Sequence, residues 1–288
     1  MRAPTRLLVL PLLLAALHHA KLGAQTQPAR AVADSMPASV RWNRLVPRLV
    51  DENAARRRAI RKAATAAGDS ATLRRLAQTP QPFLFRVYSV LGLAQYGAAS
   101  SARDDRGVSS DAAVAAASAA VLTELYADSA VRATIAGELA RDVDRAQTRA
   151  SGAARVTAGR RLGEDVASRV IAWAPPQAAM AAPWSGTIPK GPGMWTTAPG
   201  VPPIGILFAN ARPWLLDSAS QFRPAPPPAF DSPTFKAALD EVKRVARERT
   251  PEQTKIAQRW NSADPWARWN DVASAAAIRV NSARSRGK

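Results

Sequence analysis

The sequence predicts an all-α protein, in which a helical bundle and a second helical group are separated by a long irregular segment rich in proline and tryptophan. Apolar residues recur at spacings of three and four over most of the chain, which is the period of an amphipathic helix. No alternating pattern of useful strand length occurs. Thirteen of the 23 prolines fall within residues 175–232, and proline interrupts helices.

The first 24 residues have the three parts of a secretory signal peptide. Arg2 and Arg6 give a basic start, residues 7–17 are almost wholly apolar, and small residues end the segment at Ala24. An apolar stretch of this length is too short to span a bilayer comfortably. We therefore expect residues 1–24 to be a signal peptide and the protein to be exported, to the periplasm or the outside. The alternative is an uncleaved N-terminal anchor. No later stretch predicts a transmembrane segment.

The chain is strongly basic, with 40 Lys and Arg against 22 Asp and Glu. Removing residues 1–24 takes away three basic residues and leaves a net charge of about +15. Such a charge favours anionic surfaces as partners, although a solvated surface of interspersed charges explains it better. No RNP, zinc-finger or helix-turn-helix pattern occurs, so we expect no specific nucleic-acid partner.

Residues 38–174 are predicted to form an N-terminal helical bundle. The first helix has an apolar stripe from Trp42 to Leu49, followed by a charged run at residues 56–62 that predicts a solvated face. Residues 83–99 are nearly all apolar, which predicts a central helix. Three further helices are expected: one after Ser109-Ser110, one capped by Ser129, and one with its stripe from Val156 to Trp173.

Residues 175–232 are predicted to be an ordered connector rather than a disordered one. The segment has three tryptophans and a set of apolar residues that favour burial, namely Ile204, Ile206, Leu207, Phe208, Leu215 and Leu216. We expect it to be extended over a helical surface. A flexible linker is the alternative.

Three helices are predicted in the second helical group, residues 233–283. Each begins with a capping side chain followed by proline at the first helical position, in the pairs Ser232-Pro233, Thr250-Pro251 and Asp264-Pro265. Gln253 adds a capping box to Thr250. The last helix runs to the chain end without a C-cap, so we expect this group to be truncated.

Cysteine and histidine chemistry has almost no candidates. The chain contains no cysteine, and its two histidines, His18 and His19, fall within the predicted signal peptide. Catalytic triads and zinc or non-haem iron sites therefore lack their usual ligands. Adjacent carboxylates occur at Asp104-Asp105, Glu164-Asp165 and Asp240-Glu241, and surface ion pairing explains them better than catalysis. We assign no catalytic, cofactor-binding or metal-binding residue and no cofactor.

Tryptophans in the second group give one more candidate surface. Trp260, Trp266 and Trp269 have the chemistry to stack on sugars or bases. The stripe of the last helix continues from Trp269 into Val272 and Ala276, which favours a packed core instead.

The order of motifs in the C-terminal part resembles the N-terminal helical half of bacterial vanadium-dependent haloperoxidase-like proteins, of the type 2 phosphatidic acid phosphatase superfamily. The resemblance covers about residues 40–283 and is strongest over 214–273. It is carried by Trp214-Leu215-Leu216-Asp217-Ser218, Gln221-Phe222-Arg223-Pro224, Pro226-Pro227-Pro228, Asp240-Glu241-Val242-Lys243, Arg249-Thr250-Pro251-Glu252-Gln253-Thr254, Trp260 and Trp269-Asn270-Asp271-Val272-Ala273.

The resemblance implies a catalytic half that this chain lacks. In such proteins a Lys-x6-Arg-Pro motif, a Pro-Ser-Gly-His motif and a final Arg and His hold vanadate or phosphate. Arg212-Pro213 and Arg223-Pro224 stand without the lysine, because Gly205 and Leu216 occupy the position seven residues before each arginine. We therefore expect a helical module without catalysis of its own. Two readings stay open: one half of a split or truncated enzyme whose other half is separate or missing, and a basic module that binds anionic surfaces.

Overall fold

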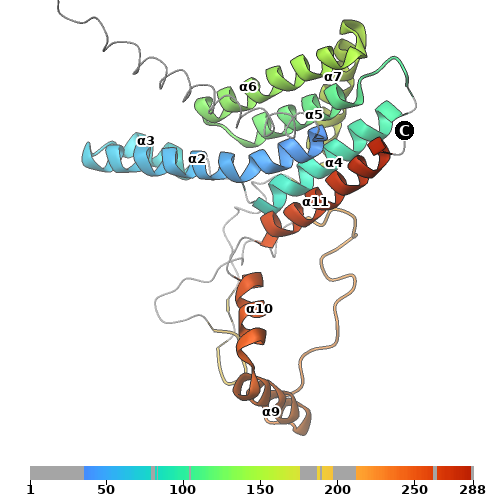
Figure 1. The fold of residues 1–288 in the computed structure, drawn as a ribbon. Helices are drawn as coiled ribbons and strands as arrows, with labels where there is room; N and C mark the ends of the chain where they lie inside the picture. Colours follow the sequence, from blue (N-terminus) through green and yellow to red (C-terminus); the bar gives the residue numbers. More distant parts are fainter. Residues whose placement is uncertain are drawn as a thin grey trace, which may run out of the picture. The chain divides into compact units, whose positions relative to one another are not determined.

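The computed structural model describes residues 36–78, 82, 84–103, 105–175, 187–188, 190–196, 212–261 and 265–286 (Figure 1). All regular secondary structure in these ranges is helical, which confirms the all-α prediction. The predicted signal peptide lies outside the described residues. Within them, no helix has both the length and the apolar character needed to cross a membrane.

The chain divides into two compact units, one of residues 1–168 with 269–288 and one of residues 169–268. The first unit holds a bundle of helices, and α7 and α11 each cross a boundary between the units. Its elements are α2 (Ala38–Ala66), α3 (Ser70–Gln78), α4 (Leu84–Arg103), α5 (Ser110–Leu125), α6 (Ser129–Ala146), the π-helical turn η1 (Gln147–Ser151), α7 (Ala153–Trp173) and α11 (Pro265–Arg286).

The central element of the bundle is α5, whereas the sequence favoured the apolar helix now seen as α4. Ten of the sixteen residues of α5 are buried, and most of them are alanine. On α4, Leu93 and Tyr96 are 39% and 72% exposed. Small side chains let neighbouring helices approach α5 from several sides, which larger apolar side chains do not allow. Helix centrality therefore depends here on side-chain size as well as on hydrophobicity.

Two glycines of α7 allow it to approach the backbone of α5. A Cβ atom at Gly163 would overlap the carbonyl oxygen of Ala113 and lie 2.9 Å from the nitrogen of Ala117. One at Gly159 would overlap the carbonyl oxygen of Ser109. Only hydrogen fits at these two positions, so they fix the separation of the two helices.

The structure describes the caps of α5 and α6, and it corrects the cap predicted for α6. The Ser109 hydroxyl accepts from the amide of Ala112 at the start of α5. At α6 the capping residue is Asp128, one position before the predicted Ser129, and its carboxylate accepts from two amides. Aspartate caps as well as serine does, and its position places the side chain over the first turn. Two elements were not predicted: α3 and η1.

The solvated face predicted at residues 56–62 of α2 is confirmed for most of the run. Arg56, Arg58, Arg61 and Lys62 are exposed. Arg57 is half-buried instead, and it donates to the carbonyl oxygen of Leu76 on α3 at 2.7 Å. One residue of the charged run therefore joins α3 to α2.

The second unit contains α9 (Pro233–Glu248) and α10 (Pro251–Asn261). Both begin as predicted: Ser232 accepts from the amide of Phe235, and Thr250 exchanges two hydrogen bonds with Gln253 in a capping box. Residues 212–232 before them contain no helix or strand. The burial predicted for Leu215 and Leu216 is wrong, because they are 87% and 43% exposed. Most of residues 175–211 and the predicted cap Asp264 lie outside the described residues.

The packed core expected for the stripe of the last helix is wrong, and the apolar residues of the C-terminal helices are largely exposed. Neither α9 nor α10 contains a buried residue. On α11, Trp266 is 46% exposed, Trp269 is 60% exposed and Val272 is 48% exposed. The stripes have the correct helical period, but period alone does not show that another element covers them.

Candidate functional site

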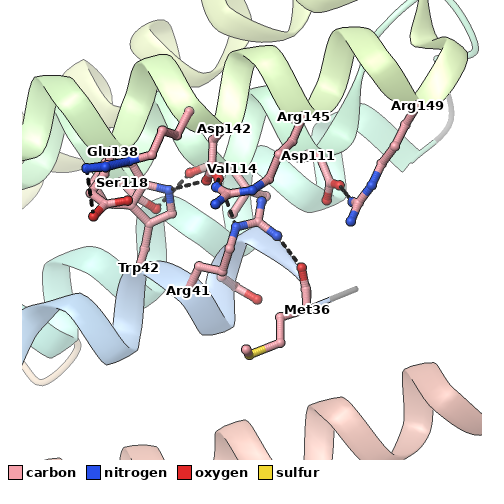
Figure 2. Close-up of polar contacts among 12 residues, drawn as sticks. Met36, Arg41, Trp42, Asp111, Val114, Ser118, Glu138, Asp142, Arg145 and Arg149 are labelled. Atoms are coloured by element: carbon pink, nitrogen blue, oxygen red, sulfur yellow. Dashed lines mark hydrogen bonds and ion pairs between the residues drawn. The ribbon is translucent and has the colours of Figure 1, made fainter. Parts of the chain in front are cut away.

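A buried polar cluster joins α2 to α6 around Asp142, as Figure 2 shows. The carboxylate is 4% exposed and accepts three hydrogen bonds. Its Oδ1 accepts from Arg41 Nε at 2.8 Å and from Arg145 Nη1 at 2.6 Å, and its Oδ2 accepts from Trp42 Nε1 at 2.9 Å. Arg41 also donates to the main-chain oxygen of Met36, just before the start of α2.

A cavity of about 250 Å³ lies against this cluster. Four arginines and two carboxylates contribute to its wall, and Arg48 donates to Glu138 at 3.1 Å. Guanidinium groups stay protonated at physiological pH, so they can bind an anion but cannot act as acid or base. The carboxylates here are already paired with arginines. The arrangement is therefore suited to holding two helices together and not to proton transfer. The lining residues are Met36, Arg41, Trp42, Arg44, Leu45, Arg48, Glu138, Asp142 and Arg145.

A larger cavity, of about 390 Å³, lies between the start of α2, α4, α5 and α11. The part of α11 that belongs to the first unit runs beside α4 (Figure 1) and lines this cavity through Ala273, Ser274 and Ala277. At its wall, the buried Gln95 donates to Ser118 Oγ at 3.1 Å. Asp111 is paired with Arg149 at 2.7 Å. These groups offer hydrogen bonds to a polar molecule and no reactive centre.

A third cavity, of about 240 Å³, lies where α5 leads into α6, next to Tyr126 and Asp128. Tyr126 is 1% exposed, and its hydroxyl has no hydrogen-bond partner among the residues that the structure describes. Burial, with a smaller contribution from Tyr88, raises the pKa of Tyr126 well above its usual value of 10.0. The hydroxyl therefore stays protonated at neutral pH and cannot serve as a base.

Asp128 gives the bundle an acid-sensitive contact. Burial works against ionisation of its carboxylate, but hydrogen bonds from Arg56 and from the amides of Val131 and Ala130 outweigh burial and lower its pKa below 3.8. Its folded-state pKa thus lies below the unfolded value. The stabilisation is present above the unfolded pKa and is lost as pH falls through the folded pKa.

We expect Asp128→Asn to destabilise the protein more at about pH 6 than at about pH 2, because asparagine retains the cap but not the charge. Urea denaturation of both proteins at the two pH values measures the difference. Asp105→Asn is the control, since Asp105 is exposed and its carboxylate accepts from the amide of Gly107 in its own turn. An equal loss of stability at both pH values would contradict the assignment.

The carboxylate pairs proposed from the sequence lie apart on exposed surfaces. Glu164 is 3.7 Å from Arg160 on α7, and Asp240 is 3.8 Å from Lys243 on α9. Asp105 accepts from the amide of Gly107, and Asp104 lies outside the described residues. Among the described residues, no three acidic or histidine side chains gather as metal ligands would. Among the described residues, neither Glu164-Asp165 nor Asp240-Glu241 belongs to such a group.

The arginines of the two Arg-Pro pairs do not form an oxyanion cradle. Both Arg212 and Arg223 are exposed, and Arg212 Nη2 donates to the main-chain oxygen of Trp173 at 2.7 Å. Vanadate or phosphate binding in the implied family needs convergent cations and a histidine. The only histidines, His18 and His19, lie outside the described residues. The residues present do not fit either group.

Tryptophans of the C-terminal part pack against one another and against an arginine, and some remain exposed. Arg268 lies over the ring of Trp260, with 5.6 Å from the guanidinium carbon to the ring centroid. Trp214 packs edge-on against Trp173 with centroids 5.4 Å apart. Trp269 exposes more than half of its side-chain surface on α11. Aromatic surface is therefore available on the C-terminal helices for another molecule.

No protein-family model, no curated protein and no solved structure gives a significant match to this chain.

Proposed function

We propose that this chain is an exported helical scaffold, related to vanadium-dependent haloperoxidases and type 2 acid phosphatases, that supports a histidine-bearing segment and does not catalyse a reaction by itself. The motif order over residues 214–273 supports the relationship. The lack of any cysteine, and of any histidine beyond position 19, supports the absence of catalysis. The histidine-bearing segment belongs to a separate chain or to sequence outside these 288 residues.

The observation that carries this proposal is the apolar surface of α11. Trp269, Val272 and Val280 are 60%, 48% and 54% exposed along one helix. Leu93 and Tyr96, on the neighbouring α4, are also exposed. Burying an aliphatic or aromatic side chain of this size contributes about 1.5–3 kcal/mol. A surface of this kind is typical of an interface, and in the proposed function its occupant is the catalytic segment.

The first test is chemical and genetic. The full chain, supplied with vanadate, hydrogen peroxide and bromide, or with p-nitrophenyl phosphate, should show no turnover above buffer. The DNA around the gene should encode a segment with Lys-x6-Arg-Pro and Pro-Ser-Gly-His. Turnover by the chain alone would overturn the non-catalytic part of the proposal, and unrelated neighbouring DNA would overturn the partner.

The second test addresses the surface. Co-expressed with that segment, the tagged wild-type chain should co-purify with it, whereas Trp269→Asp and Val272→Asp should reduce recovery at least tenfold, about 1.4 kcal/mol. Ile60→Asp is the matched control, because Ile60 is 38% exposed on α2, away from α11. If all three variants were recovered as well as the wild-type chain, α11 would not form the interface.

A further inference from the structure

The helix α9 has an apolar face that is exposed over most of its length. Leu239 is 39% exposed, Val242 is 66% exposed and Val245 is 50% exposed. At 3.6 residues per turn these side chains lie on one face of the helix, together with Ala238 and Ala246. Phe235 begins the same face and is half-buried against Phe230, with ring centroids 5.1 Å apart. A face that is apolar over about three turns indicates a second helix as its neighbour.

The charges at the two edges of this face have opposite signs. Lys236 and Lys243 lie along one edge, and Glu241 and Glu248 lie along the other. Glu248 also accepts from Arg244 at 3.2 Å, and Lys243 is 3.8 Å from Asp240. Those two pairs are exposed and contribute little, so the edge charges remain available to a neighbour.

The edge charges choose between two symmetric ways of pairing two copies of α9. In a parallel pair, the lysine edge of one helix faces the glutamate edge of the other. In an antiparallel pair, lysine faces lysine and glutamate faces glutamate, which is repulsive. We propose that α9 is the interface of a parallel homodimer, in which the apolar faces of two copies pack in register.

An anionic lipid surface fits the same helix less well. Amphipathic helices that lie on such surfaces carry lysine or arginine around the polar face. The edge with Glu241 and Glu248 would be repelled by anionic head groups. This dimer is independent of the proposed scaffold function, because it uses α9 and not α11.

Cysteine cross-linking tests the pairing directly, because the natural chain contains no cysteine. Ala246 lies on the apolar face near the end of α9, so Ala246→Cys should give a disulfide-linked dimer under mild oxidation. In a parallel pair the two copies of residue 246 are adjacent, whereas an antiparallel pair places them at opposite ends. Arg244→Cys, two residues away on the opposite face, is the matched control and should remain monomeric.

Sedimentation without any cross-link gives the second measurement. The wild-type chain should sediment as a dimer, and Val242→Asp as a monomer with unchanged helical circular dichroism. Lys243→Glu should weaken the dimer at least tenfold, and Lys243→Glu with Glu241→Lys should restore it. A monomeric wild-type chain, equal cross-linking at residues 244 and 246, or binding to phosphatidylserine vesicles without self-association would overturn the proposal.

Discussion

Gly163→Ala should destabilise the helical bundle by about 3 kcal/mol, which lowers the Tm by roughly 10 °C. The added methyl group would overlap the carbonyl oxygen of Ala113 and crowd the nitrogen of Ala117, 2.9 Å away. Both atoms belong to the backbone of α5, which has no rotamer to change. The helices α5 and α7 must therefore separate, and the contacts of the central helix are lost along with the clash.

Gly92→Ala is the control for this substitution. Gly92 lies within α4, and a Cβ atom there would meet nothing within 4 Å. Alanine favours a helix over glycine by about 1 kcal/mol, so this variant should be more stable than the wild type. Urea denaturation followed by circular dichroism compares the two variants. A Gly163→Ala variant that was more stable than the wild type would contradict the close approach of α7 to α5.

The helices and their first residues could be predicted from the sequence because the signals are local. An apolar stripe and a cap are both read within one or two turns, and Ser232 and Thr250 cap α9 and α10 as expected. The shift from Ser129 to Asp128 at α6 is a one-residue error between two good capping residues.

Burial could not be predicted in the same way, because it depends on which element covers a stripe. The stripes of α5 and α9 both have helical spacing, yet α5 is the centre of the bundle and α9 contains no buried residue. The sequence also favoured α4 as a central helix, since its apolar residues are larger than the alanines of α5. The distance at which helices pack, set by alanine in α5 and glycine in α7, decides which helix is central in the bundle.

The buried polar clusters were missed because their members are far apart in the chain. Asp142 is about a hundred residues from Arg41 and Trp42. One local signal was present: Asp142 follows Ile135 by seven residues and so lies on the apolar stripe of α6. An acid in that position indicates a buried partner, but spacing alone does not identify which arginine or tryptophan supplies it.

Asp142→Ala should cost about 4 kcal/mol in the free energy of unfolding, because the carboxylate accepts from Trp42 Nε1 and compensates two arginines. Removing it leaves a buried indole N–H and the half-buried guanidinium groups without their counter-charge. Asp142→Asn retains an acceptor for Trp42 and should lose less stability. Urea denaturation at neutral pH measures each loss.

Asp240→Ala separates this effect from the general loss of an acidic residue. Asp240 is exposed and lies 3.8 Å from Lys243, so its removal should change stability by no more than about 0.5 kcal/mol. A small loss for Asp142→Ala as well would mean that α2 and α6 are held by their apolar contacts alone. A large loss would show that this polar cluster, and not only the apolar core, fixes α2 against α6, because hydrophobic packing has no comparable directional requirement.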